Sequence, residues 1–271
     1  MRVHHLNCGT MRPLGGKLID GEPGLLRRAE MVCHCLLIEA GSELVLVETG
    51  MGTGAVERPA AWLGRSFVHT VGVRTTMTET AVHQVRALGH EPEDVRHIVL
   101  THLDLDHAGG LADFPHATVH ANAQELREIS GPRYRHVQFA HGPKWQPHEP
   151  TGEPWYGFAA TRPLSEIPAE VVLVPLAGHT RGHTGVAVRT ANGWLLHAGD
   201  AYFHPGELAG RPHCPPALGL FESRVQTDRS TRLANQARLR ELATHREITV
   251  VNAHSPAELA RVRQPALEAI P

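Results

Sequence analysis

The sequence has few cysteines, no long apolar run and almost no excess of charge. Four cysteines in 271 residues are too few for a disulfide-stabilised scaffold, so we expect free thiols in a reducing compartment. Lys and Arg number 26 against 28 Asp and Glu, which argues against binding nucleic acid through net charge. No apolar run approaches the roughly 18 residues of a membrane helix, and the N-terminus lacks the apolar core of a signal peptide. We therefore expect a cytoplasmic protein.

Histidine, by contrast, is abundant. The chain holds 21 histidines against 26 Lys and Arg together, and imidazole is the commonest metal ligand in proteins. With 41% hydrophobic and 20% charged residues, the rest of the composition is that of an ordinary globular protein. The histidines are therefore the first place to look for chemistry.

Short apolar runs alternate with helical patterns along the chain, which predicts a layered α/β protein. We expect helices over 78–88, after Asp228 and over 256–269, with a further helix starting at Asn122 and Glu125. We expect strands at residues 32–39, 44–48, 95–100, 117–121, 171–174, 185–189, 194–197 and 248–252.

Residues 131–163 break this pattern. Prolines alternate there with aromatic residues such as Trp145 and Trp155, and no amphipathic period survives. A long loop in a compact domain is usually functional, although a surface loop packed on its own aromatics fits equally well.

Four potential metal ligands lie within six residues, directly after the strand predicted at 95–100. They are arranged as His102-x-Asp104-x-Asp106-His107, and two glycines follow shortly after them. Residues 102, 104 and 106 of an extended chain project to one side, and a turn at the glycines would bring residue 107 beside them. Left without a cation, such close buried polar groups would cost on the order of several kcal/mol in desolvation. The pattern therefore predicts a metal loop.

Three further polar motifs stand at the ends of later predicted strands. They are Gly178-His179-Thr180, Gly199-Asp200 and the single residue His254. Each motif alone is a weak signal, but the four in this order resemble the metallo-β-lactamase superfamily of metallohydrolases over about residues 32–254. Within that superfamily the pattern is most similar to the N-acyl homoserine lactonase-like group.

The resemblance implies a fold and a set of metal ligands. The fold would be a four-layer αββα sandwich with the metal site at one edge, formed by residues 1–271 as a single domain with a loop insertion at about 131–163. The cofactors would be two divalent ions, zinc first, with manganese or iron as alternatives. The resemblance assigns one ion to His102, Asp104 and His179, the other to Asp106, His107 and His254, and a bridging role to Asp200. It places His183, and by its strand position His197, behind the ligands rather than among them.

Two residues depart from the family pattern. Asp104 stands where the family usually has a second histidine, and Glu48 stands where a shorter aspartate usually braces the metal loop. Two divalent ions carry +4, and the three carboxylates with a bridging hydroxide carry −4, so the site sums to about zero. A site one unit less positive than usual should raise the pKa of bound water. The additional oxygen ligand should also tilt metal preference from zinc toward manganese or iron.

The resemblance implies hydrolysis of a lactone or carboxylic ester by attack of metal-bound hydroxide. Asp106 would orient the nucleophile and carry its proton, and Tyr202 would hydrogen-bond the substrate carbonyl, with segment 131–163 forming one wall of the pocket. Tyr202 stands one residue away from the spacing that the lactonases use, and a role as a wall residue is the alternative.

Three other functions stay open at this point. Arg181 and Arg211 would suit a phosphodiester hydrolase, whereas Asp104 and Glu48 would suit a sensor with a degenerate metal loop. The third is an iron-dependent oxidoreductase on the same scaffold. As partners we expect a small-molecule substrate, no nucleic acid and no membrane, and we leave room for a homodimer.

Overall fold

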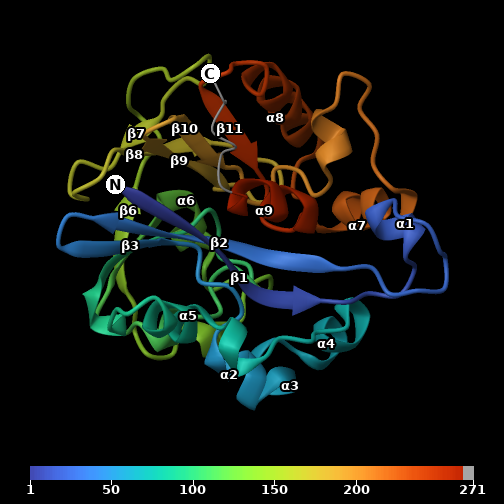
Figure 1. Ribbon diagram of the computed structural model, residues 1–271, viewed down its shortest axis with the longest axis horizontal. Helices are drawn as coiled ribbons and strands as arrows, with labels where there is room; N and C mark the ends of the chain where they lie inside the picture. The colour runs from blue at the N-terminus through green and yellow to red at the C-terminus, as the bar shows by residue number, and fades with distance from the viewer. Residues whose placement is uncertain (265–271) are drawn as a thin grey trace.

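The computed structural model describes residues 1–264, whose strands form two sheets lying face to face (Figure 1). The first sheet has the order β1-β2-β3-β4-β5-β6 and is antiparallel up to β3 and parallel from β3 onward. Its strands span Arg2–Met11, Met31–Ala40, Glu43–Val47, Val95–Val99, Thr118–Asn122 and Lys144–His148.

The second sheet has the order β11-β10-β9-β8-β7, in which only the β10–β11 pair is parallel. Its strands are β7 (Arg162–Pro163), β8 (Val171–Pro175), β9 (Thr184–Thr190), β10 (Gly193–His197) and β11 (Ile248–Val251).

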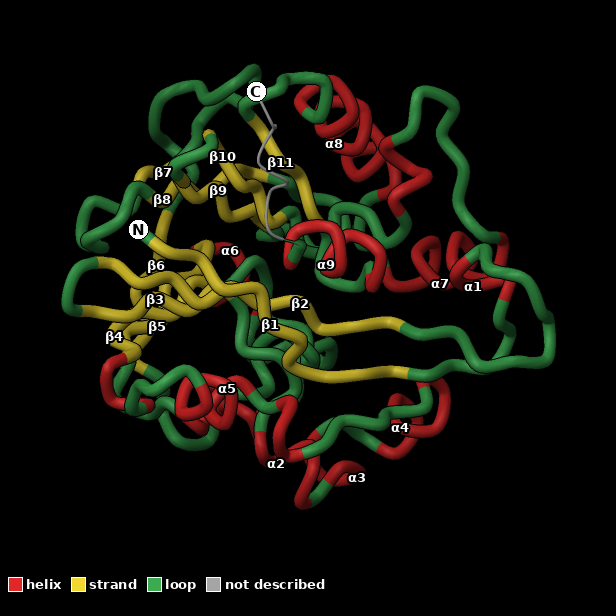
Figure 2. Tube along the Cα trace, viewed as in Figure 1, coloured by secondary structure: helices red, strands yellow, loops and turns green. Residues whose placement is uncertain are grey.

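Helices cover the outer faces of both sheets, so the molecule has the four layers of an αββα sandwich (Figure 2). On the first sheet they are α2 (Thr53–Glu57), α3 (Pro59–Trp62), α4 (Arg65–Val71) and α5 (Ala81–Ala87). The second sheet carries α8 (Arg229–Leu242), and the remaining helices are α1 (Lys17–Asp20), α6 (Ala123–Glu128), α7 (Pro216–Val225) and α9 (Pro256–Arg263).

Apolar residues on both faces of the strands form the core. Ile98 packs under α5 on the outer face of the first sheet, whereas its neighbour Val99 packs between the sheets. Val250 and Val251 divide in the same way, with Val250 packing beneath α8. Strands buried on both faces need continuous rather than alternating apolar runs, which is why they are legible in the sequence.

The predicted strands are confirmed with small shifts at their ends, and three expectations need correction. The pattern did not indicate β1 because polar residues interrupt it, and only its second half is largely buried. The helix expected over 78–88 is shorter, because extended backbone at Thr80 separates a 3-10 turn at Met77–Glu79 from α5. Residues 131–163 are not a structureless loop, since they contain β6, β7 and a 3-10 turn at His136–Phe139.

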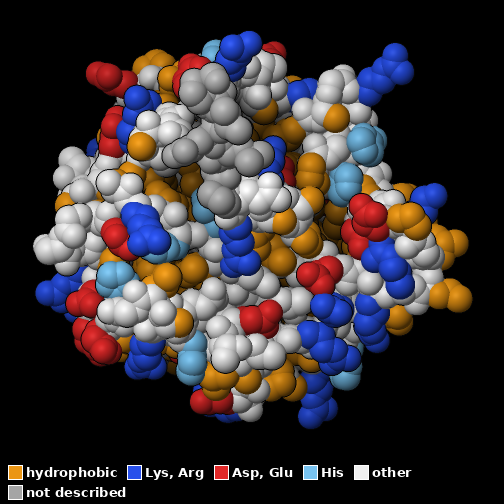
Figure 3. Space-filling view, viewed as in Figure 1, with side chains coloured by type: hydrophobic (Ala, Val, Ile, Leu, Met, Phe, Trp, Pro, Cys, Tyr) orange, Lys and Arg blue, Asp and Glu red, His pale blue; other side chains and the backbone are white. Residues whose placement is uncertain are grey.

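The last helix and the segment between β1 and β2 complete the description. The last helix, expected over 256–269, spans Pro256–Arg263, and residues 265–269 lie outside the described residues. The segment between β1 and β2 forms an arm whose helix α1 lies beside α7 (Figure 1). Leu25 and Leu26 of this arm are exposed. Hydrophobic side chains protrude at the arm's end of the face shown in Figure 3. Among the described residues, no helix is long and apolar enough to cross a membrane.

Candidate metal centre

The structure brings together all seven residues predicted as metal ligands. The loop after β4 supplies four of them. The amides of residues 107 and 108 both donate to the carbonyl of Asp104 at 3.0 Å, and this turn brings His107 back beside His102. The loops after β8, β10 and β11 supply the other three, which are His179, Asp200 and His254. Each side chain therefore stands just beyond the end of a strand, as expected.

One half of the centre is formed by His102, Asp104 and His179 with one oxygen of Asp200. Asp104 Oδ2 lies 3.4 Å from His102 Nε2 and 3.0 Å from His179 Nε2. Asp200 Oδ2 lies 3.8 and 3.4 Å from the same two nitrogens.

The other half is formed by Asp106, His107 and His254 with the second oxygen of Asp200. Asp200 Oδ1 lies 3.3 Å from His107 Nε2 and 3.0 Å from His254 Nε2. The carboxylate of Asp106 lies 3.9 and 3.8 Å from these two nitrogens.

These donor sets fit two divalent ions. Tetrahedral ligands at the usual 2.0–2.1 Å from a zinc ion stand about 3.3–3.4 Å apart, which is close to the separations in both halves. His102 Nε2, His107 Nε2 and Asp200 Oδ1 are buried and have no hydrogen-bond partner among the described residues. Buried polar atoms are rarely left without a partner, so orphaned atoms aimed at one point indicate a cation site.

Glu48 braces the metal loop despite its extra methylene group. Its Oε2 accepts a hydrogen bond from His107 Nδ1 at 2.7 Å, and its Oε1 accepts one from the amide of Thr101 at 2.5 Å. Glu48 has φ 64°, a left-handed backbone that costs free energy in a non-glycine residue. That backbone places the longer side chain under the loop, so the brace is kept.

Arg133 pairs with Asp104, which sequence analysis missed. Arg133 Nε donates to Asp104 Oδ1 at 2.6 Å, and a second guanidinium nitrogen donates to Oδ2 and contacts His179 Nε2 at 2.9 Å. The pair adds one positive charge beside the centre, so the charge sum made without Arg133 is too negative by one unit. The expected rise in the pKa of bound water therefore loses its basis, whereas the extra carboxylate oxygen remains as an argument for manganese or iron. A pairing across 29 residues leaves no local signal in the sequence.

Glu125 links two of the loops that form the metal centre. We expected it to help start a helix, but its carboxylate bonds these loops instead. Its carboxylate accepts hydrogen bonds from the amide of Leu103 at 3.1 Å, the amide of Gly182 at 3.0 Å and the hydroxyls of Thr180 and Tyr134. A buried carboxylate with four donors holds the loops after β4 and β8 in one arrangement.

His183 lies behind the ligands, as expected. Its Nε2 accepts a hydrogen bond from the amide of Asp200 at 3.0 Å, and its Nδ1 donates to the carbonyl of Leu176 at 3.1 Å. A Cβ at Gly199 would stand 2.7 Å from His183 Nε2, which explains the glycine before Asp200. His197 is also buried, and its Nε2 donates to the carbonyl of His34 at 2.8 Å.

Burial and neighbouring charges act against each other on the ionisable groups. Burial alone would raise the pKa of Asp200, but His254 and His107 hold that pKa well below its usual range. Burial likewise opposes ionisation of Asp104, whose pKa is held low by His102, His179 and Arg133. Both carboxylates are therefore ionised at neutral pH and can bind a cation.

Tyr202 is not brought to the site, so its expected contact with a substrate carbonyl is wrong. The side chain is fully buried in the core beneath α8, where its hydroxyl donates to the carboxylate of Glu258 at 3.0 Å. The next residue, Phe203, faces the site instead and stacks on His254 with ring centroids 5.1 Å apart. Consecutive residues here point in opposite directions, and the one that meets the cavity has no hydroxyl.

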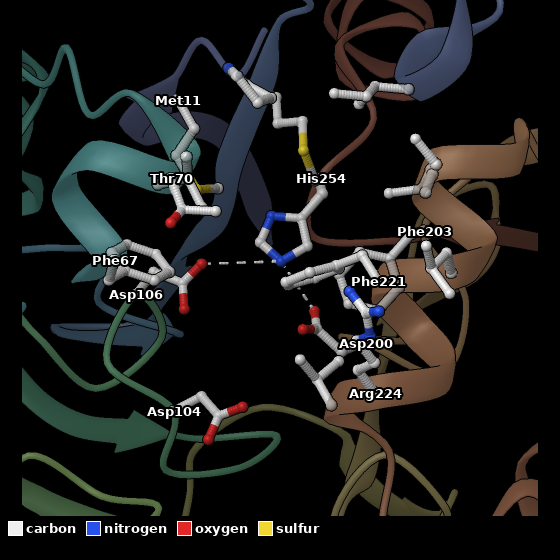
Figure 4. A pocket seen from close by; sticks show the side chains of 18 of the residues that line it. Met11, Phe67, Thr70, Asp104, Asp106, Asp200, Phe203, Phe221, Arg224 and His254 are labelled. Atoms are coloured by element: carbon white, nitrogen blue, oxygen red, sulfur yellow. Dashed lines mark ion pairs between the residues drawn. The ribbon is translucent and has the colours of Figure 1, made fainter. Parts of the chain in front are cut away.

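A cavity of about 530 Å³ opens onto the metal centre. Figure 4 shows Asp106, Asp200 and His254 turned toward one another at its floor. Its walls come from the arm before β2, from α4 and from α7, which lie far apart in the sequence and meet only in the fold. The apolar lining residues are Met11, Pro13, Leu14, Ile19, Met31, Phe67, Val71, Leu105, Phe203, Ala217, Leu218, Leu220, Phe221 and Val225.

The aromatic residues of 131–163 do not line this cavity, so that expectation is also wrong. Trp145 packs under the first sheet, whereas Trp155 packs against Trp194 on the second. Arg133 is the one residue of this segment in the wall. Arg181 and Arg211 do not line the cavity either, which removes the basis for their proposed phosphate contact.

Comparison with known families and proteins finds similarity to metallohydrolases. The model of the metallo-beta-lactamase superfamily matches residues 28–254. A probable metallo-hydrolase of Mycobacterium tuberculosis is 45% identical over 269 residues, covering 94% of this chain and 81% of its own length. An N-acyl homoserine lactonase, AttM of Rhizobium radiobacter, is 32% identical over 186 residues, covering 65% of this chain and 64% of its own length.

Solved structures share the fold at low sequence identity. A mutant of Bacillus thuringiensis AiiA with N-decanoyl-L-homoserine bound at its active site superposes with a TM-score of 0.72 at 20% identity, covering 96% of both chains. AidC, a dizinc quorum-quenching lactonase, superposes with a TM-score of 0.64 at 16% identity, covering 94% of this chain and 87% of its own.

Proposed function

The chain belongs to the metallo-beta-lactamase superfamily of hydrolases, and on that premise we propose that it cleaves a lactone or carboxylic ester with an apolar acyl portion. We further propose that it uses two divalent ions, with zinc as the first candidate, held by the seven converging residues.

The observation that carries the substrate class is the apolar cavity that ends at the metal centre. Its volume of about 530 Å³ lies in the range of small-molecule sites, and its walls are mostly aliphatic and aromatic. Burying an acyl chain against such walls gains about 25 cal/mol per Å² of apolar surface. The lactonase relatives and the product complex of the AiiA mutant support the same class.

Divalent ions in such a centre, when bound, polarise a carbonyl oxygen and make water a nucleophile near neutral pH. The chain's own residues then have separate tasks. Asp106 lies at the cavity floor with about a tenth of its side chain exposed, where it would accept a proton from the attacking water and return it to the leaving alkoxide. Phe203 and Phe221 would exclude bulk water and hold the acyl chain.

The structure weakens the motive for a sensor with a degenerate metal loop, whereas cationic side chains in the cavity wall keep phosphodiesters as an alternative substrate class. Asp104 points into the centre and Glu48 braces His107, so neither substitution makes the metal loop degenerate. Arg133 and Arg224 line the cavity, and Arg133 is already paired with Asp104. Phosphodiesters therefore belong in the test as the competing substrate class.

The test is a substrate panel on protein freed of metal and then reloaded with zinc, with metal content measured alongside. We expect acyl homoserine lactones and aryl esters with long acyl chains to turn over, and chelated protein to lose that activity. Turnover of phosphodiesters alone would contradict the lactone or ester proposal. One equivalent of zinc at full activity would contradict the use of two ions.

A further inference from the structure

Three histidines stand side by side on neighbouring strands of the first sheet, away from the cavity just described. His97 lies on β4, His120 on β5 and His148 on β6. Their strand neighbours Ile98 and Val119 pack on the outer face, so His97 and His120 face the second sheet. None of the three lines the substrate cavity.

These imidazoles form a chain that ends beside a carboxylate from the second sheet. His97 Nδ1 lies 2.9 Å from His120 Nε2, and His120 Nδ1 lies 2.9 Å from His148 Nε2. Glu166, on the connection between β7 and β8, places Oε1 3.8 Å from His120 Nδ1 and 3.5 Å from His148 Nε2. The two imidazoles and the carboxylate therefore surround one point.

We propose that this point is a separate metal site, outside the metal centre described above. It takes a divalent transition ion such as zinc through His120 Nδ1, His148 Nε2 and Glu166 Oε1. The three donor atoms are 2.9, 3.5 and 3.8 Å apart, around the separation of about 3.3–3.4 Å for tetrahedral ligands. Hydrogen bonding explains the histidine chain by itself. It does not explain why Glu166 is held near both nitrogens but beyond hydrogen-bond distance from each.

The surrounding groups provide the support that a ligating histidine usually has. With Nδ1 of His120 on the ion, its Nε2–H would donate to His97 Nδ1, and the Nε2–H of His97 faces Glu43 Oε2 at 3.5 Å. A carboxylate behind a ligating imidazole fixes its tautomer and raises its basicity. Burial and the neighbouring histidines lower the pKa of His120 to about 4, so its ring is neutral at pH 7 with a lone pair available.

The site would join the two sheets at one edge of the sandwich. His120 and His148 belong to the first sheet, whereas Glu166 belongs to the short connection that starts the second. About a third of the Glu166 side chain is exposed, so solvent can supply the fourth ligand. We therefore expect a structural role, because the site touches neither the cavity nor the first metal centre.

The experiment compares the wild-type protein with Glu166→Gln and His148→Gln by titrating zinc into chelator-treated protein. Glu170→Gln is the matched control, because Glu170 is an exposed glutamate of the same connection and belongs to no donor cluster among the described residues. We expect wild type and Glu170→Gln to bind one equivalent more than Glu166→Gln or His148→Gln. The difference does not depend on how many ions the first centre takes, so failure of this proposal and of the proposed function are distinguishable.

Thermal unfolding gives a second readout. At zinc 100-fold above its dissociation constant, the extra site should raise the Tm of wild type by about 5–10 °C more than that of Glu166→Gln. Equal zinc stoichiometry in wild type, Glu166→Gln and His148→Gln would overturn the proposal, as would binding of the extra ion in the millimolar range only. Glu166 lies at the surface with about a third of its side chain exposed, so its variant should fold and give a decisive result.

Discussion

The metal centre and the walls of the substrate cavity adjoin one another but are constructed in different ways. Each metal-centre residue lies on a loop that follows a strand, and several are held from behind, as Glu48 holds His107. The cavity walls come from short helices and an arm that meet only through tertiary packing, such as α1 against α7. A reaction centre at strand ends can thus stay constant while the walls change, which separates reaction type from substrate choice.

The strongest test of this contrast is loss of the residue shared by the two halves of the metal centre. Asp200→Ala removes both oxygens that face the two histidine sets, so we expect kcat to fall on the order of 10³-fold or more. Metal content and steady-state kinetics would measure it, with Glu149→Ala as a control on an exposed glutamate. Full activity in Asp200→Ala would show that the centre is not organised around this carboxylate.

Substitution of Arg133 tests whether a residue of the cavity wall also contributes to metal affinity and activity. Arg133→Met leaves Asp104 without its partner, and loss of such a partner typically costs 10–100-fold in metal affinity or activity, roughly the effect we expect. Arg135→Met is the control, because Arg135 bonds only the backbone carbonyls of Ala61 and Trp62 among the described residues. Equal zinc affinity and turnover in both variants would mean that the Arg133–Asp104 pair is incidental.

The Arg133–Asp104 pair also predicts that substitutions of its two residues change zinc affinity in a non-additive way. Asp104→His alone would place an imidazole against an unpaired guanidinium, so zinc binding should weaken rather than tighten. Adding Arg133→Met to that variant should recover part of the loss. Zinc competition titrations of both single variants and the double variant would show the coupling, and simple additivity would count against charge compensation.

A smaller effect should distinguish the wall seen in the structure from the wall expected from sequence. Phe221→Ala shortens the apolar wall, so kcat/KM for long acyl chains should fall about tenfold while short chains change little. Trp155→Phe is the contrast, because Trp155 packs on Trp194 away from the cavity and should leave both substrates unaffected. Chain-length profiles that respond to Trp155→Phe but not to Phe221→Ala would reverse this assignment.

The smallest effect on turnover should come from Tyr202. Tyr202→Phe removes a buried hydroxyl that donates to Glu258, so we expect turnover to stay within about twofold and the free energy of unfolding to drop by about 1–2 kcal/mol. Kinetics and urea unfolding measure the two quantities separately. A large fall in kcat with unchanged stability would return Tyr202 to the reaction.

How far the sequence reaches can be judged from particular residues. The loop from His102 to His107 and the residues His179, Asp200 and His254 were legible because strand ends in parallel and mixed sheets gather at one edge. Strands such as β8 were legible because burial on both faces demands continuous apolar runs. The prediction that the segment containing Trp145 and Trp155 lines the cavity was wrong, because an irregular aromatic pattern does not indicate against which part of the fold its side chains pack.

The sequence by itself predicted the layered architecture from local patterns, and its resemblance to the metallo-β-lactamase superfamily supplied the candidate donor residues and the class of reaction. Only the tertiary structure decided that Arg133 offsets the charge of Asp104, that Phe203 rather than Tyr202 meets the cavity, and that α4 and α7 form its walls. The physical reason is separation along the chain. A contact between distant segments depends on how elements pack and on which way a side chain turns, and neither leaves a periodic signal in the residues that make it.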